Sequence, residues 1–69
     1  MPASYNDALG QVWAVDVETN SGDRIVFQSG LGIRVADCED STFGERVKHG
    51  AVSLPELRPY FVRSRAPAN

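Results

Sequence analysis

Residues 11–29 read QVWAVDVETNSGDRIVFQS, and this stretch carries the clearest structural pattern in the chain. Trp13, Val15 and Val17 alternate with small or acidic residues, and this period of two is typical of a strand with one buried face. A second run, residues 24–29, places Ile25 and Phe27 on one face in the same way. We therefore predict two antiparallel strands that form a hairpin, with the Trp13 side chain buried.

The segment between the two strands, residues 20–22, has the sequence Asn-Ser-Gly, which is typical of a turn. Gly22 can adopt the positive φ that closes a three-residue loop. A two-residue loop would instead set Asp16 opposite Phe27 and divide the apolar face between the two sides of the hairpin. The three-residue loop predicts these opposed pairs: Val17 with Ile25, and Glu18 with Arg24.

Further along the chain, Gly30 and Gly32 interrupt the pattern, and a third strand follows up to Asp37 with Ile33 and Val35 on one face. Residues 45–54 then predict a fourth strand. Pro59 lacks a backbone donor and disfavours helical angles in the preceding residue, so only one helical turn is expected before it. Residues 60–63 predict a short closing strand.

This order of elements predicts an all-β fold, a small five-stranded barrel with one short helical turn. It resembles the layout of Src-homology-3 barrels in element order alone. The alternative is an α+β fold, with a three- or four-stranded antiparallel sheet and a short helix at about residues 43–49. Residues 42–45, Thr-Phe-Gly-Glu, have the spacing of a helix capping box, which favours this helix. Gly44 in its first turn disfavours it, and we expect the strand.

The length of 69 residues allows one domain, which we assign to residues 10–63, with residues 1–9 and 64–69 as flexible termini. A chain this short buries a small core, so we expect it to associate with a partner or with further copies of itself. Its longest apolar runs are far shorter than a membrane span, and its N-terminus lacks the pattern of a secretory signal. Together with a single cysteine, Cys38, these features predict a cytoplasmic protein without a membrane association.

Residue types that carry enzyme chemistry are sparse. Cys38 and His49 are the one candidate pair of thiol nucleophile and base, and nothing in their spacing indicates catalysis. The carboxylates of residues 37–40 lack the length and ligand alternation of a calcium loop. Gly30 and Gly32 are not followed by the residues of a phosphate-binding loop. We therefore predict a protein that is not an enzyme, with no metal and no cofactor.

Charge is distributed unevenly along the chain. Residues 1–45 contain eight acidic and two basic side chains, whereas residues 46–69 contain five basic and one acidic. The acidic loop, which we define as Asp37, Glu39 and Asp40, is a candidate contact surface for a basic protein partner. We predict a non-enzymatic interaction module that binds another protein through this loop or through a sheet edge. Its small size is typical of accessory, inhibitory or regulatory proteins, including those of phages and bacteria.

The alternative function is binding of nucleic acid by a small barrel. Exposed aromatic side chains beside basic groups are typical of surfaces that bind single strands. The net charge of −2 weighs against this function, because non-specific affinity depends on neutralising phosphates. The residues that would form this surface are Lys48, Arg58, Tyr60, Arg63 and Arg65.

Overall fold

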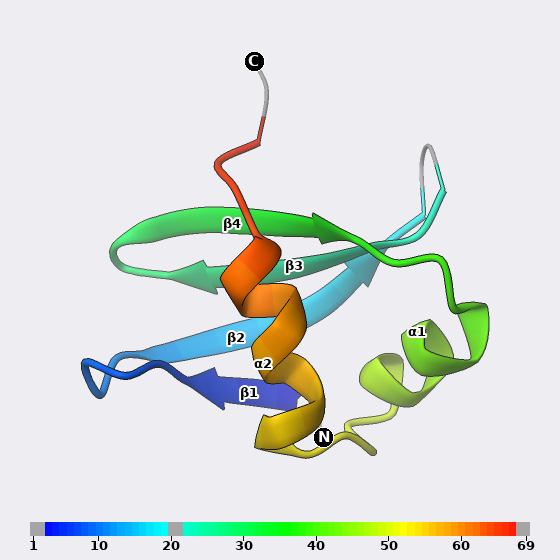
Figure 1. Ribbon diagram of the computed structural model, residues 1–69, viewed down its shortest axis with the longest axis horizontal. Helices are drawn as coiled ribbons and strands as arrows, with labels where there is room; N and C mark the ends of the chain where they lie inside the picture. The colour runs from blue at the N-terminus through cyan, green and yellow to red at the C-terminus, as the bar shows by residue number, and fades with distance from the viewer. Residues whose placement is uncertain (1–2, 20–21, 68–69) are drawn as a thin grey trace.

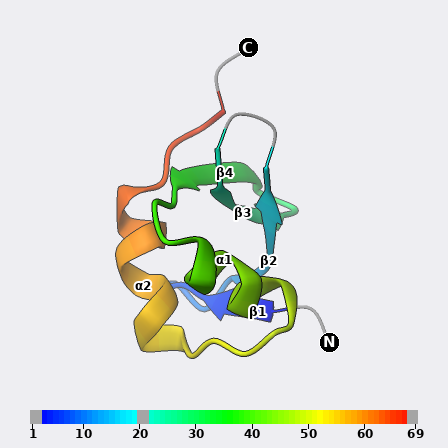
Figure 2. The same ribbon diagram turned by 90° about the vertical axis from the view of Figure 1, so that its right-hand side faces the viewer.

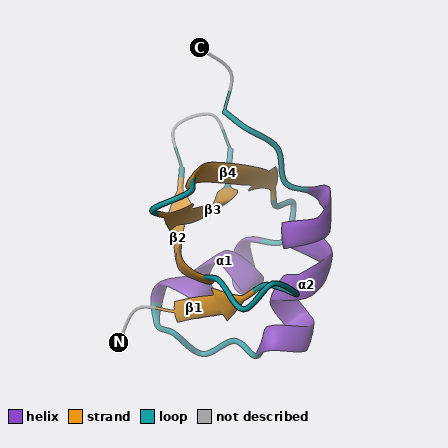
Figure 3. Cartoon of the chain, turned by 90° about the vertical axis from the view of Figure 1, so that its left-hand side faces the viewer, coloured by secondary structure: helices purple, strands orange, loops and turns teal. Residues whose placement is uncertain are grey.

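A computed structural model describes residues 3–19 and 22–67 of the chain. Four strands form one antiparallel sheet in the order β1-β2-β3-β4, and two helices lie on the same face of it (Figures 1 and 3). Neither helix in the described ranges has the length and apolar character needed to span a membrane. The elements are β1 (Ala3–Asn6), β2 (Val12–Glu18), β3 (Arg24–Ser29), β4 (Gly32–Asp37), α1 (Ser41–Lys48) and α2 (Leu54–Arg63).

The sheet is open, so the closed five-stranded barrel is wrong and the alternative α+β fold describes the chain better. β1 and β4 form the two edges of the sheet and do not pair with each other. The segment expected to form a closing strand is helical, and the segment expected to form a fourth strand is divided between the end of α1, a connection over residues 49–53 and the first residue of α2. Figure 2 shows the sheet curving around the two helices, which fill its concave side.

The β2–β3 hairpin has the predicted register. Val17 lies opposite Ile25, and Glu18 lies opposite Arg24. Gly22 has a φ of 98°, the positive value that a turn at this point requires. The other two residues of the predicted turn, 20 and 21, lie outside the described residues. The hairpin prediction is confirmed because alternation and turn residues are local features that act over a few positions.

β4 has the opposite phase from the one expected. A tight turn sets Arg34 opposite Phe27 and Ala36 opposite Ile25, so Arg34 and Ala36 face the helices. Val35 and Ile33 consequently lie on the outer face of the sheet, although Val35 is still buried there. The turn register decides the phase, because a shift of one residue moves every side chain of a strand to the other face.

Both ends of the chain contribute more structure than the expected 10–63 domain includes. Ala3–Asn6, within the expected flexible terminus 1–9, form β1 and pair with β2, with Tyr5 opposite Trp13. At the other end, Arg65 forms an antiparallel bridge with Val35 of β4 through two backbone hydrogen bonds. β1 is only four residues long, which explains why its alternation is a weak signal in the sequence.

α1 includes the first four residues of the segment that was expected to be the fourth strand. Asp40 is its N-cap and its side chain accepts hydrogen bonds from the backbone of Thr42 and Phe43. Phe43 and Val47, one helical turn apart, are both buried. Gly44 weighed against a helix, but a Cβ at this position would lie 3.3 Å from the Asp23 side chain. The glycine therefore allows α1 to approach this part of the sheet closely.

α2 replaces the expected helical turn and closing strand with ten helical residues. Ser53 and Glu56 form a capping box at its start. Pro59 lies inside the helix, where it costs one backbone hydrogen bond, to the carbonyl of Pro55. That loss is offset by burial, because Leu57 is fully buried and Phe61 packs against the core.

The core lies between the concave face of the sheet and the two helices. Trp13 is buried there as predicted, with 5% of its surface exposed. Phe61 of α2 is at the centre of an aromatic cluster, with its ring 4.8 Å from that of Tyr5, 5.3 Å from that of Trp13 and 5.1 Å from that of Phe27. α2 crosses from the β1 edge to the β4 edge of the sheet, so this cluster fixes its position (Figure 1).

Candidate functional site

The carboxylates of the acidic loop have partners within the chain. The Asp37 side chain lies 3.8 Å from Arg24 and 3.5 Å from Arg65, in two ion pairs. Asp40 caps α1, with distances of 3.0 and 3.2 Å to two backbone nitrogens. Glu39 is exposed. Two of the three carboxylates therefore have structural roles, which makes the loop a weaker candidate for a contact surface.

The basic candidates are only partly brought together. Arg58, Tyr60 and Arg63 all lie on α2. Lys48 lies on α1, where its amino group is 3.4 Å from Glu45. Arg65 follows α2 and is paired with Asp37 as described above. The structure thus places three of the five candidates on one helix and the other two in ion pairs.

The aromatic side chains of α2 are not free to stack on a ligand. Phe43 is stacked on Tyr60 with a ring distance of 4.8 Å, and the guanidinium of Arg63 lies 4.8 Å from the centre of the same ring. The Tyr60 ring is therefore engaged in two contacts within the chain. Burial raises the pKa of the Tyr60 phenol, and its contact with the Cys38 thiol raises it further. Phe61 is half-buried and packs against the rings of Tyr5, Trp13 and Phe27.

Two adjoining hollows lie along the exposed side of α2. The first, of about 690 Å³, is formed between α2 and the end of β1, and the second extends along α2 itself. They share Arg58 and Val62, so they form one continuous surface, which we name the α2 surface. Val62 is 73% exposed, a high value for a valine. The residues that line the α2 surface are Tyr5, Asn6, Asp7, Ala8, Arg34, Arg58, Pro59, Tyr60, Phe61, Val62 and Arg63.

Arg34 is fixed in place beside α2 by the residue that ends the helix. Its Nε donates to the Ser64 hydroxyl and its Nη2 to the Ser64 carbonyl, both at 2.7 Å. Its guanidinium also lies 5.4 Å from the centre of the Phe61 ring. Within residues 3–19 and 22–67, no carboxylate lies within ion-pair distance of Arg34, Arg58 or Arg63. The α2 surface therefore carries three guanidinium groups that are not neutralised by the described part of the chain.

Asp7 is the acidic residue beside the first hollow, and its carboxylate is engaged within the chain. It accepts hydrogen bonds from the Trp13 indole at 3.0 Å and from the backbone of Leu9 and Gln11. The bond from Trp13 is the main reason why the pKa of Asp7 lies below its usual value. This carboxylate holds the β1–β2 turn and is not directed at the arginines of α2.

The two sheet edges, the other expected contact regions, differ in how they are covered. Both backbone groups of Val35 on the β4 edge pair with Arg65. Pro67, two residues on, has no N–H with which to extend that pairing toward Ile33. At the other edge, the antiparallel pattern directs the backbone of Asn6 outward, and the described residues provide no backbone partner for it. This open edge adjoins the α2 surface, which Asn6 also lines.

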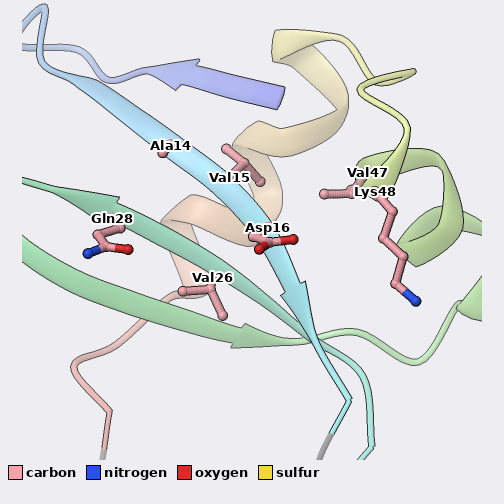
Figure 4. Close-up of a pocket in the computed structure, with 7 residues that line it drawn as sticks. All are labelled: Ala14, Val15, Asp16, Val26, Gln28, Val47 and Lys48. Carbon is pink, nitrogen blue, oxygen red and sulfur yellow. The ribbon is translucent and has the colours of Figure 1, made fainter. Parts of the chain in front are cut away.

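A third hollow, of about 390 Å³, lies where α1 meets β2 and β3 (Figure 4). Asp16 is directed at the backbone N–H of Val17, at 2.8 Å. Figure 4 shows the Lys48 side chain extending away from Asp16, so the two charges do not converge on a ligand position. This hollow is therefore a gap in the packing of α1 rather than a site with converging polar groups.

The residues considered for enzyme chemistry are not assembled. The Cys38 thiol is buried and lies 3.3 Å from the Asp40 carbonyl. His49 is exposed at the C-cap of α1, whereas Cys38 precedes the N-cap at the other end of this helix. Asp16 and Glu18 lie on the outer face of β2. In the described ranges, no three side chains of the metal-ligating types come together.

Sequence reasoning missed Arg34 and Val62 as members of the candidate site. Arg34 was assigned the wrong face because the phase of β4 was reversed. Val62 was read as part of a strand, although Arg58 and Val62 are spaced by four residues, as on one face of a helix. The signal that could have identified this helix is the spacing of Leu57, Tyr60 and Phe61, which matches the buried side of α2.

Comparisons with protein-family models, with curated proteins and with solved structures find no match to this chain. We therefore infer function from the α2 surface itself.

Proposed function

We propose that this protein is a non-enzymatic interaction module that binds an acidic surface of another protein through the α2 surface. The observation that carries this proposal is the pairing of two unneutralised arginines, Arg58 and Arg63, with the exposed apolar side chain of Val62. Arginine is enriched at protein interfaces, where it contributes both charge and apolar contact area. An acidic partner with an apolar centre complements this arrangement.

The α2 surface is held in position before a partner arrives. Leu57 and Phe61 anchor the opposite side of α2 in the core, and Ser64 fixes the guanidinium of Arg34. A surface that is already ordered loses less conformational entropy on binding than a mobile one. The protein is therefore suited to bind as a rigid body, as accessory, inhibitory and regulatory proteins commonly do.

A protein partner is favoured over nucleic acid, the alternative function, by the state of the aromatic rings. Binding of single strands uses bases stacked on exposed aromatic faces. Tyr60 is already stacked on Phe43 and lies beneath the Arg63 guanidinium, and the half-buried Phe61 packs against the core. The remaining basic candidates, Lys48 and Arg65, are in ion pairs with Glu45 and Asp37. The α2 surface thus combines arginines that are unpaired in the described part of the chain with aromatic rings that are already engaged in contacts within it.

The proposed role is carried out without thiol catalysis and in the cytoplasm. The separation of Cys38 from His49 supports a role without thiol catalysis. A free, buried cysteine is typical of proteins in reducing compartments, and we place the activity in the cytoplasm. The acidic loop stays a prediction as a second contact region, with less support because two of its carboxylates already have partners.

The proposal is tested by affinity capture from the native host with three forms of the protein: wild type, Arg58→Glu and Lys48→Glu. Both variants change the net charge by the same amount, but Lys48 lies on α1, away from the α2 surface. Bound proteins are identified by mass spectrometry after nuclease treatment. We expect a protein retained by wild type and Lys48→Glu and lost with Arg58→Glu.

A protein retained equally by all three forms would contradict binding through α2. Fluorescence anisotropy with single-stranded DNA and RNA provides the second arm. Retention of nucleic acid at physiological salt that is lost with Arg58→Glu would replace the proposal with the nucleic-acid alternative. Folding of each variant is checked by circular dichroism, and no change is expected because Arg58 is exposed.

A further inference from the structure

A second surface is apolar and lies at the end of the sheet that holds the β1–β2 and β3–β4 turns. Figure 1 shows both turns at the same end, as the antiparallel strand order requires. Leu9 in the first turn is 91% exposed and Leu31 in the second is 71% exposed. Val12 and Ile33, at the adjoining strand starts, are also exposed. We name these four side chains the turn-end patch.

The two leucines are presented by ordered turns. The backbone N–H of Leu9 donates to the Asp7 carboxylate at 2.9 Å, and that of Leu31 donates to the Ser29 hydroxyl at 3.0 Å. Turn positions of this kind usually carry small or polar residues such as glycine, asparagine and aspartate. An exposed leucine at each of two neighbouring turns is therefore a feature that the fold itself does not require.

A hollow of about 470 Å³ lies between the two turns. Leu9, Leu31 and Ile33 form its rim, and the rings of Trp13 and Phe61 line it from the core. Its two charged lining residues are already engaged, Asp7 with the Trp13 indole and Arg34 with Ser64. The hollow and its rim therefore present mainly apolar contacts, and the hydrogen bonds to Ser64 hold the Arg34 guanidinium in place.

We propose that the turn-end patch is a self-association surface, to which a second copy of this chain binds about a two-fold axis. In such a pair the same patch serves both copies, so a projecting leucine must lie beside a hollow that accepts it. Leu31 and the hollow between the turns meet this requirement. The α2 surface does not, because two copies would bring Arg58 and Arg63 against the same arginines.

The size of the patch agrees with a second copy as the occupant. Its four side chains expose roughly 400–500 Å² per copy, within the range of patches that mark interaction sites. Burial on both copies with the surrounding backbone approaches about 1,000 Å², the lower end of specific interfaces. A chain of 69 residues also has a small core, which makes added apolar burial valuable for stability.

The test is sedimentation equilibrium of the full chain from about 1 to 300 µM. The variants are Leu9→Glu and Leu31→Glu, and the matched control is Val62→Glu, which places the same charge on an equally exposed apolar residue of α2. We expect wild type and the control to form dimers in this range. Each leucine variant should weaken association at least about tenfold.

A wild-type chain that stays monomeric to the highest concentration would overturn the proposal. So would dimers that persist in both leucine variants, or that are lost only with Val62→Glu. Circular dichroism and tryptophan fluorescence verify the fold, and Leu31→Ser gives a milder variant should glutamate disturb the turn. Because Leu9 and Leu31 lie outside the α2 surface, their variants should still capture the proposed acidic partner, which separates this test from that of the proposed function.

Discussion

The acidic loop and the α2 surface carry opposite charges, and they differ more in what those charges contact than in their sign. Asp37 lies against two arginines and Asp40 caps α1. Arg58 and Arg63 on α2 have no carboxylate within ion-pair distance among the described residues. Both regions are equally conspicuous in the sequence. A charge run therefore indicates a binding surface only when the fold leaves its members without internal partners.

The two sides of α2 are expected to differ most in their effect on stability. The side with Leu57 packs in the core, whereas the side with Val62 is exposed and is proposed to bind a partner. Leu57→Ala removes a fully buried side chain and should lower the free energy of unfolding by about 2–5 kcal/mol. The matched variant Val62→Ala, on the exposed side, should change it by less than about 0.5 kcal/mol. Urea denaturation followed by Trp13 fluorescence measures both. Equal effects would contradict the assignment of an anchored side and a free side.

Trp13→Ala tests whether the core that supports α2 behaves as one unit. The indole packs against Phe61 and also donates to Asp7, so its loss should cost about 3–5 kcal/mol. A domain of this size has little stability to spare, and we expect the variant to be largely unfolded. Thermal unfolding by circular dichroism gives the measurement, and a native-like transition would exclude Trp13 as a central core residue.

Asp40 tests the structural role of the acidic loop. Asp40→Ala removes the N-cap of α1 and should destabilise the protein by about 1 kcal/mol. Asp40→Asn should be close to wild type, because asparagine is an equally good N-cap. Chemical denaturation of the two variants compares them directly. If alanine and asparagine behave alike, the side chain does not cap the helix and is free for another role.

A pH titration extends the same reasoning to Asp7. Its pKa is lowered by the Trp13 hydrogen bond in the folded protein, so its carboxylate stabilises the fold above the unfolded pKa of about 4. That contribution is lost as the pH falls through the lowered folded value. Asp7→Asn should therefore show a shallower decline of stability below pH 4 than wild type. If the acid-unfolding curves of wild type and Asp7→Asn are parallel, the hydrogen bond from the Trp13 indole does not lower the pKa of Asp7.

The β2–β3 hairpin could be predicted from the sequence because its determinants are local. The alternation of Trp13, Val15 and Val17 and the position of Gly22 lie within a few residues of one another. The phase of β4, meaning which of its side chains face the core, could not be predicted in this way. The tight turn before β4 sets this phase, and the alternation of Ile33 with Val35 predicted the opposite one.

The two helices, α1 and α2, were not predicted because tertiary packing outweighs the local backbone preferences of Gly44 and Pro59. Gly44 is a poor helix former, yet the close approach of α1 to the sheet leaves little room for a side chain. Pro59 removes one hydrogen bond, which is a small loss beside the burial of Leu57 and the aromatic contacts of Phe61. Since the α2 surface exists only if this segment is helical, the strand prediction left Val62 outside the candidate site, and the reversed phase of β4 left out Arg34.

The most direct measurement of the central claim compares association rates of the captured partner with two variants across a salt titration. One is Arg58→Glu on the α2 surface. The other is the acidic-loop triple variant Asp37→Asn, Glu39→Gln, Asp40→Asn, which keeps a side chain able to cap α1. Electrostatic complementarity acts chiefly on the association rate. We predict that Arg58→Glu slows association and flattens its salt dependence, whereas the triple variant leaves both close to wild type. The reverse result would assign the partner to the acidic loop and contradict binding through α2.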